Sequence, residues 1–350
     1  MRAWGDLPGD DRKRERTTTE AELEAAGIDL DPPPPGRRQD EAHGEPGHAH
    51  PHEHSSAGEP PVIGIVGAGA VGTALGVALS RAGWRIHAVA SRDATRRERF
   101  RSLVEVNRAF VDPEPLVEEV ELIILAVPDD VIGPLASTLR MYGGQAMIHT
   151  SGALGAEVLA PAMAAGTQVG SFHPLVAFAD TERAVAALRG ATIAIEADDQ
   201  LAAMLAAMAE AIGATPVRLA HGAKAAYHAA AVLAAGGFVA LLDAIAELGR
   251  VAGLDEAGSL AIYGPLIEGT LANARALGIA AALTGPITRG DLGTLSAHLD
   301  TLRQHAPGAM ALYVAAAYRE VELAERRGAL APELVQRTRQ TLDDAVAPTR

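Results

Sequence analysis

The sequence predicts an α/β fold in which a doubly wound, mostly parallel sheet is followed by an all-helical C-terminal region. From Pro61 onward, short apolar strand patterns alternate with helical ones, beginning with Val62–Val66 and a helix over Val71–Ala82. The segment Leu122–Val127 is almost wholly apolar, which is typical of a strand buried in a parallel sheet. Beyond Thr215–Leu219 the strand patterns end and alanine-rich segments of helical length follow.

The remaining elements follow from the same patterns. Further strands are expected at Trp84–Ala90, Gln145–His149, Val169–His173 and Thr192–Glu196, and helices over Arg92–Val106 and Asp130–Leu139. The C-terminal helices are expected over Gly222–Ala252, Asp255–Leu277, Asp291–Gln304, Gly308–Arg327 and Pro332–Val346. The first of these is apolar on nearly every side, so we expect it to be covered all round, inside its domain or in a dimer interface.

Composition excludes several classes of function. The chain has 350 residues and a net charge of −14, and aromatic residues make up 3% of it, so no nucleic-acid partner is expected. There is no cysteine, which excludes disulfides and thiolate ligands, and no secretory signal pattern, so a cytoplasmic protein is expected. The one membrane-like stretch, Ala225–Ala246, carries His228 and Asp243 and is interpreted as a buried helix, with no membrane partner.

Residues 1–60 differ from the rest, because charge runs and four consecutive prolines leave little apolar surface. We predict a disordered leader rich in histidine and proline. Its histidines are suited to weak zinc or nickel binding, although a solvated polar tail without a metal is favoured because the sequence encodes no fixed geometry. These histidines are His43, His48, His50, His52 and His54.

Three glycines join the first strand to the first helix. Gly67 permits a tight turn, Gly69 lets the backbone approach a pyrophosphate, and Gly72 allows close packing of helix on strand. Unpaired N–H groups at a helix start attract anions, so this segment predicts dinucleotide binding. We assign residues 61–220 to a Rossmann-like dinucleotide-binding domain. Residues 221–350 are assigned to a helical substrate and dimerisation domain. The alternative is a structural glycine turn. The remaining cofactor-binding candidates in the loop are Ala68, Ala70 and Val71.

Two further loops at the carboxyl edge of the sheet are expected to contact the cofactor. The second strand ends in Ser91 and Arg92 with no carboxylate before them, which favours NADP, although NAD is possible because Asp93 follows. The backbone of Val127 and Pro128 ends the apolar strand and is expected to lie beside the cofactor.

The segments after the next two strands open onto the same crevice. Ser151, Gly152 and His173 are therefore candidates to hold a substrate, with Ser151 also a catalytic candidate. The alternative is that Thr150 and Ser151 cap a helix over Ala156–Ala160.

Lys224 and His228 are the strongest catalytic candidates. They are four residues apart on a helix, so their side chains share one face. Hydride transfer to a carbonyl leaves negative charge on oxygen, which requires a proton donor, and a desolvated lysine has a suitable pKa. The alternative is a lysine that reaches the surface and a satisfied histidine. No metal-binding residues are predicted in the folded body.

Arg289 lies in a shaped loop, Leu283–Asp291, before a helix that Asp291 is placed to cap. Its guanidinium is suited to binding a substrate carboxylate or phosphate. The alternative is that Arg289 forms an ion pair with Asp291 and has only a structural role.

Five motifs in this order carry a resemblance over residues 61–345: GAGAVGTALGVAL, HTSGAL, GSFHPLVAF, KAAYHAAAVLA and LTGPITRGD. They resemble an uncharacterised family of oxidoreductases with an N-terminal Rossmann-like NAD(P)-binding domain and a C-terminal helical domain of unknown function. More distantly the chain is similar to pyrroline-5-carboxylate reductase and to the 6-phosphogluconate and 3-hydroxyisobutyrate dehydrogenases, which implies a helical domain like the C-terminal one of 6-phosphogluconate dehydrogenase.

In those hydroxyacid dehydrogenases a helix carries a lysine and, four residues on, an asparagine beside the reacting carbon. The resemblance puts Lys224 on the lysine and His228 on the asparagine, and this departure leaves the substrate class open. It also implies a homodimer in which the Thr284–Asp291 loop enters near the neighbouring cleft.

Together these features predict an NAD(P)-dependent oxidoreductase, with NADPH favoured, that moves hydride to or from a small anionic carbonyl, imine or hydroxy acid. The alternative is a non-catalytic dinucleotide-binding sensor that acts through a helical dimer.

Overall fold

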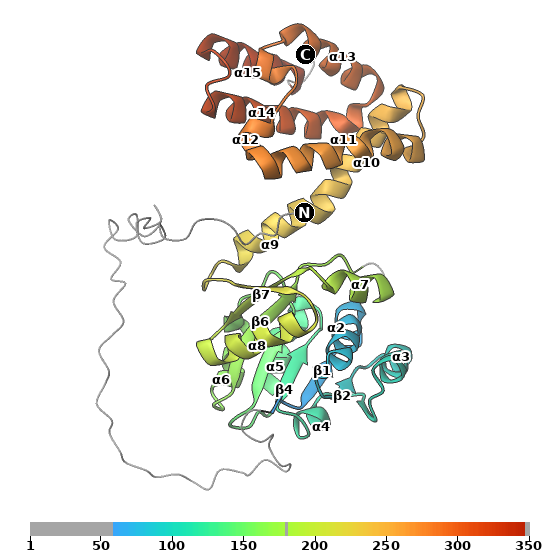
Figure 1. The fold of residues 1–350 in the computed structure, drawn as a ribbon, viewed down its shortest axis with the longest axis vertical. Coiled ribbons are helices and arrows are strands. Elements are labelled where there is room, and N and C mark those ends of the chain that lie inside the picture. Colours follow the sequence, from blue (N-terminus) through green and yellow to red (C-terminus); the bar gives the residue numbers. More distant parts are fainter. Residues whose placement is uncertain (1–58, 179–180, 347–350) are drawn as a thin grey trace, which may run out of the picture. The chain divides into compact units, whose positions relative to one another are not determined.

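The computed structural model describes residues 59–178 and 181–346 (Figure 1). The predicted leader lies outside these residues apart from its last two positions. Within the described part a single eight-stranded sheet has the order β3-β2-β1-β4-β5-β6-β7-β8, and its neighbours run parallel except β6 and β7. The strands are β1 (Ile63–Val66), β2 (Ile86–Ala90), β3 (Arg108–Phe110), β4 (Leu122–Leu125), β5 (Ala146–His149), β6 (Gln168–Pro174), β7 (Thr192–Ala197) and β8 (Thr215–Arg218).

Helices cover both faces of this sheet, because its strands are apolar on both sides. In β4, Leu122 and Ile124 join one buried cluster while Ile123 and Leu125 join the other, as the alternation of side chains along a strand requires. One cluster lies under α2 (Ala70–Arg81), α3 (Ala94–Val104), α7 (Thr181–Leu188) and α8 (Asp199–Ala211). The other lies under α4 (Glu114–Val117), α5 (Asp129–Thr138), the 3-10 helix η1 (Ala156–Leu159) and α6 (Ala160–Met163).

From residue 224 to 346 the described chain is helical. The elements are α9 (Lys224–Val232), the π-helical turn η2 (Leu233–Gly237), α10 (Phe238–Val251), α11 (Glu256–Leu277), α12 (Ile279–Ala282), η3 (Ile287–Arg289), α13 (Leu292–His305), η4 (Pro307–Ala309), α14 (Met310–Arg326) and α15 (Pro332–Val346). Leu295, Leu299, Val314, Val321 and Leu342 form the centre of a core shared by α13, α14 and α15. The predicted α/β fold with an all-helical C-terminal region is therefore confirmed.

Of the two expectations for the first long helix, burial inside its own domain was wrong for the described chain, and a place in a dimer interface stays a prediction. Helices α9 and α10 form one stretch that the π turn η2 interrupts, and only Ala246 and Gly249 of α10 are buried. Leu233 is 72% exposed and Val239 is 64% exposed. An apolar surface of this kind is usually an interaction site, so whatever covers it lies outside the described chain.

Local differences from the predicted elements have local causes. The segment expected to be helical over 156–160 is a 3-10 turn followed by α6, whose first turn contains a proline. The sequence patterns missed β3, α4, α7 and α8. Of these, β3 has only three residues, and α8 is so rich in alanine that its buried stripe has little contrast with its exposed face.

Candidate active site

The glycine loop between β1 and α2 has the geometry of a phosphate cradle. Gly67 has a φ of +106°, and a Cβ there would lie 2.2 Å from the Ala126 carbonyl oxygen. A Cβ on Gly72 would lie 2.0 Å from the Gly67 carbonyl oxygen, so both positions require glycine for packing. Gly69 is different, because no described atom lies within 4 Å of the position of its Cβ. It stands at the N-cap of α2, where free N–H groups face open space suited to a phosphate.

The loop after β4 lies against this cradle. The Ala126 N–H donates to the Val66 carbonyl oxygen at 2.8 Å, and Val127 packs beside the tight turn at Gly67. Pro128 then forms the N-cap of α5. The predicted contact segment Val127–Pro128 is therefore adjacent to the glycine loop.

Asp93, the carboxylate after β2 that left NAD possible, is hydrogen-bonded within the protein. Asp93 caps α3, since its carboxylate accepts from the Arg96 N–H at 3.0 Å. The Ser91 carbonyl oxygen accepts from the Arg97 guanidinium. Arg92 is exposed and forms no ion pair with any residue that the structure describes. Three arginines thus surround the end of β2, of which the sequence patterns singled out only Arg92.

Lys224 is the most unusual side chain of the site. It is one of two lysines in the chain, the other being Lys13, and only 2% of it is exposed. Its ammonium donates to the Ser151 carbonyl oxygen at 2.7 Å. Burial lowers the pKa of Lys224 to about 8, and the negative charges of Glu196, Asp129 and Glu157 oppose that shift. The amine is therefore half protonated near pH 8.

The acceptor for Lys224 is held by a compact turn after β5. The Ser151 hydroxyl accepts from the N–H groups of Ala153 and Leu154, at 3.2 and 3.0 Å, so it stabilises the turn. The alternative that Thr150 and Ser151 cap a helix over Ala156–Ala160 was wrong, because Gly155 stands at the start of that segment and no side chain caps it. The Ser151 N–H donates to His149 Nδ1 at 3.2 Å, and His149 Nε2 donates to the Gly155 carbonyl oxygen at 3.1 Å.

These bonds define the state of His149. Burial lowers the pKa of His149 to about 4, and the charge of Lys224 lowers it further. The imidazole is therefore neutral with its hydrogen on Nε2, because Nδ1 receives a hydrogen and Nε2 faces a carbonyl oxygen. The sequence patterns assigned no role to His149, since nothing in its neighbours predicts these two contacts.

Gly152, His173 and His228 meet where Ser151 and α9 come together. A Cβ on Gly152 would lie 2.4 Å from His228 Nδ1 and 2.7 Å from His173 Nε2, so both imidazoles approach the bare Cα. The His173 and His228 rings lie edge to face with centroids 6.0 Å apart. His173 also contacts Tyr227, whose hydroxyl lies 3.3 Å from His173 Nδ1. Burial lowers the pKa of His173 to about 4, with further lowering from Lys224 and His228.

A second polar cluster joins β7 to the segment that precedes α9. Glu196 is buried, and its carboxylate accepts from the Ala156 N–H at 3.2 Å and lies 3.1 Å from His221 Nδ1. With Glu157 these groups place three ligand atoms within 4.8 Å of one another, a grouping that could hold a metal ion. The sequence analysis predicted no such group. The contact with the Ala156 N–H and the contact with His221 account for the position of the Glu196 carboxylate without a metal.

Arg289 is not part of the cluster around Lys224. It lies in η3 and is exposed, and its guanidinium forms no hydrogen bond or ion pair with any described residue. The alternative of a direct pair with Asp291 is not observed either, because the Asp291 carboxylate caps α13 through the N–H and hydroxyl of Thr294. Binding of a substrate anion by Arg289 stays a prediction.

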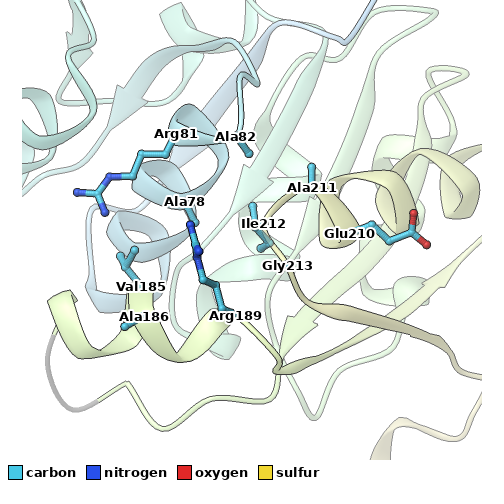
Figure 2. A pocket seen from close by; sticks show the side chains of 10 residues that line it. All are labelled: Ala78, Arg81, Ala82, Val185, Ala186, Arg189, Glu210, Ala211, Ile212 and Gly213. Carbon is cyan, nitrogen blue, oxygen red and sulfur yellow. The ribbon is translucent and has the colours of Figure 1, made fainter. Parts of the chain in front are cut away.

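A separate cavity of about 740 Å³ lies at the other end of α2 from the glycine loop (Figure 2). It is bounded by the last turns of α2, α7 and α8, and the Arg189 side chain extends across it toward Ala78. None of the predicted site residues lines it. Because three helix C-termini meet there, Arg81 and Arg189 are well placed to offset the negative ends of the helix dipoles.

Two family models match the chain. A Rossmann-like domain matches residues 50–174, and a domain of unknown function, DUF2520, matches residues 191–320. The predicted order of a Rossmann-like domain and a helical domain of unknown function is thus confirmed. No curated protein matches the chain at a significant level.

Several solved structures share this fold. BF3122 from Bacteroides fragilis, named as a candidate NADP oxidoreductase, is 25% identical with a TM-score of 0.62, over 75% of this chain and 98% of its own. A reductive aminase from Aspergillus terreus, in complex with NADPH and ethyl-5-oxohexanoate, is 16% identical with a TM-score of 0.56, over 83% and 96%. A 1-pyrroline-5-carboxylate reductase from Streptococcus pyogenes is 16% identical with a TM-score of 0.51, over 82% and 98%. The chain therefore shares its fold with these three proteins, one of which was solved with NADPH bound.

Proposed function

We propose that this protein is an NADP-dependent oxidoreductase that transfers hydride between the nicotinamide and a small anionic carbonyl, imine or hydroxy acid. The observation that carries the proposal is the buried Lys224, whose pKa is about 8, at the carboxyl edge of a sheet that also carries a glycine cradle. A reductase needs both an anion site for a dinucleotide and a proton donor near neutral pH.

The space around the three glycines supports dinucleotide binding independently of the sequence motif. Gly67 and Gly72 are glycines because neighbouring backbone fills their Cβ positions, whereas the space beside Gly69 is open. A pyrophosphate bound there would face the first-turn N–H groups of α2, with Ala68, Ala70 and Val71 around it. The bound cofactor would supply the hydride and accept it back in the reverse direction.

Ser91 and Arg92 support NADP over NAD in this proposal. A ribose 2′-phosphate needs positive charge, and Arg92 carries an unpaired guanidinium at the end of β2 among the described residues. The one nearby carboxylate, Asp93, is held at the start of α3 and is therefore poorly placed to bind a ribose 2′-hydroxyl.

Lys224 acts as the proton donor in reduction. Its hydrogen bond to the Ser151 carbonyl oxygen fixes the amine, and its lowered pKa makes proton transfer easy at the pH of the cell. His228 and Ser151 orient the reacting group, Gly152 and His173 bound its space, and Arg289 is assigned to the substrate anion.

The protein is further proposed to act as a homodimer in the cytoplasm. Within the described residues one helical stretch, Lys224–Val251, is long and apolar enough to span a membrane by length and composition, with a mean hydropathy of 2.1 and 6% of its window buried. Its first residue is Lys224, which is built into the site next to Ser151. In α11, Ile262 is 55% exposed and Leu266 is 65% exposed, so this helix also has an exposed apolar face. We therefore assign the exposed apolar faces of α10 and α11 to a second copy of the chain rather than to lipid.

The test is consumption of NADPH and NADH by the full chain, followed by absorbance, with a panel of small 2-oxo acids, other ketones and cyclic imines. We expect turnover with NADPH, and a loss of kcat of about 100-fold to 10,000-fold in Lys224→Met. Calorimetry should give the same NADPH affinity for both proteins, and Lys13→Arg is the matched control.

Binding of NADPH by the wild-type protein without turnover on any compound would favour the dinucleotide sensor. Unchanged turnover in Lys224→Met would remove this residue from the mechanism.

A further inference from the structure

One atom of the site has no hydrogen-bond partner, although it is buried. His228 Nδ1 is the only ring nitrogen among the described residues that is both fully enclosed and unpaired. A buried polar atom without a partner destabilises the fold, and such atoms in folded proteins are usually matched by a ligand or by water. The position of His228 Nδ1 therefore indicates where a polar atom of another molecule binds.

Gly152 shows where that atom lies. A Cβ on Gly152 would be 2.4 Å from His228 Nδ1 and 2.7 Å from His173 Nε2, so the two nitrogens face the same small space above the Gly152 Cα. Any other residue at this position would fill that space. The two imidazoles can thus contact one atom from two sides.

Tyr227 determines which ring nitrogen of His173 carries the hydrogen. Its hydroxyl lies 3.3 Å from His173 Nδ1, and the two rings are edge to face at an interplanar angle of 88°. Nδ1 is the one hydrogen-bond partner of this hydroxyl among the described residues, and with the phenol as donor Nδ1 is the acceptor. Since burial keeps His173 neutral, its single hydrogen then stands on Nε2 and points into the space above Gly152.

The set of donors around this space selects the reacting group. A carbonyl oxygen accepts from the His173 Nε2–H, and the hydroxyl that it becomes can donate to His228 Nδ1. An imine is reduced as the protonated iminium, whose nitrogen has an N–H and no lone pair. Such a nitrogen could donate to His228 Nδ1, but it has no lone pair to accept from the His173 Nε2–H, and its positive charge would be repelled by the ammonium of Lys224.

We propose that Tyr227 is a positioning residue that holds His173 as the Nε2–H tautomer, and that His173 and His228 bind the oxygen of a carbonyl substrate rather than the nitrogen of an imine. This inference rests on the proposed function. In the reaction, the carbonyl carbon gains the hydride of the reduced nicotinamide, and the C=O π electrons move to oxygen. The oxygen takes the proton of Lys224, so the products are an alcohol, a neutral amine and the oxidised nicotinamide.

The chain contains its own matched control for Tyr227. His298 Nδ1 lies 2.9 Å from the Tyr313 hydroxyl, and the two rings are edge to face at 89°, so the same pair recurs between α13 and α14. Both tyrosines can be changed to phenylalanine with the ring left in place. Only the change at Tyr227 should alter the site.

The first measurement is the tautomer of His173 by ¹⁵N NMR of the full chain labelled at histidine, with the signal assigned through His173→Asn. We expect the Nε2–H tautomer in the wild-type protein and in Tyr313→Phe, and a mixture of tautomers in Tyr227→Phe. A wild-type His173 with its hydrogen on Nδ1, or no change in Tyr227→Phe, overturns the assignment. A merely structural role of Tyr227 would not move this signal.

The second measurement uses two probes of the same carbon number, 2-oxopentanoate and 1-pyrroline-2-carboxylate, added to the NADP-saturated protein. We expect the ketone to shift the His173 and His228 ¹⁵N signals, and Tyr227→Phe to weaken its binding about tenfold. A response to the imine alone, or to neither compound, overturns the proposal. Calorimetry of NADPH binding on the same samples separates this failure from a failure of the proposed function.

Discussion

The helical stretch from Lys224 to Val251 buries a charged side chain in its first part and exposes apolar side chains in its second part, which is the opposite of the usual arrangement. At the first end a lysine is 2% exposed and a histidine nitrogen is enclosed without a partner. At the other end α10 is strongly apolar, yet Val239 is 64% exposed. A buried charge and an exposed apolar face both cost free energy in an isolated chain. The comparison supports the proposals that a substrate completes the first end and a second copy of the chain completes the other.

The largest expected effect concerns the apolar end. Val239→Asp places a charge in the proposed interface twice per dimer, so the dissociation constant of the dimer should rise at least 100-fold, or about 3 kcal/mol. Sedimentation equilibrium measures it. Leu103→Asp, at an apolar residue of α3 that is 46% exposed, is the control and should leave the dimer intact. A wild-type protein that is monomeric at all concentrations contradicts the account of this end.

The next effect concerns stability at the polar end in acid. Burial lowers the pKa of His149 to about 4 from an ordinary value near 6.5, so the folded state resists protonation. The stability that this group contributes is complete above pH 6.5 and is lost as the pH falls toward 4, by about 3 kcal/mol. Urea unfolding at several pH values should show a smaller loss in His149→Gln. The exposed control His305→Gln should follow the wild-type curve, and identical curves for all three proteins would exclude His149 as the cause.

A smaller effect tests how the polar end meets the cofactor. Apart from its neighbours in the chain, no atom of the described residues lies within 4 Å of the Cβ position at Gly69, so Gly69→Ala should leave the free energy of unfolding unchanged. The methyl group would occupy space assigned to the pyrophosphate, so the Kd for NADPH should rise about tenfold, or 1.4 kcal/mol. Gly143→Ala adds a methyl group in an equally open position away from the site. Equal affinities for the two variants would show that the glycine loop does not hold the phosphates.

The sequence predicted much of this site because its main features are local. The order of glycines in one loop and the four-residue spacing of Lys224 and His228 are visible without a fold. The contacts that define the chemistry join residues far apart in the chain. Tyr227 meets His173 across 54 positions, and Lys224 meets Ser151 across 73. No spacing rule reports such pairs, so Tyr227 and His149 received no role.

The exposed face of α10 could not be predicted for a related reason. Its apolar composition indicates that another surface covers it, but composition does not identify that surface. An apolar helix in a core has the same composition as one in an interface. The role of Ser151 could not be predicted either. Its hydroxyl accepts from backbone N–H groups of a turn, while its carbonyl oxygen accepts from Lys224, which is distant in the sequence.

The central claim is that burial prepares Lys224 to donate a proton, and the ionisation of its amine tests this most directly. Since Lys13 is the only other lysine, Lys13→Arg labelled with ¹³C-lysine gives a single ε-carbon signal that can be titrated by NMR without knowledge of the substrate. The account predicts a pKa for Lys224 of about 8. An amine that titrates at or above its ordinary value of 10.5 would contradict it.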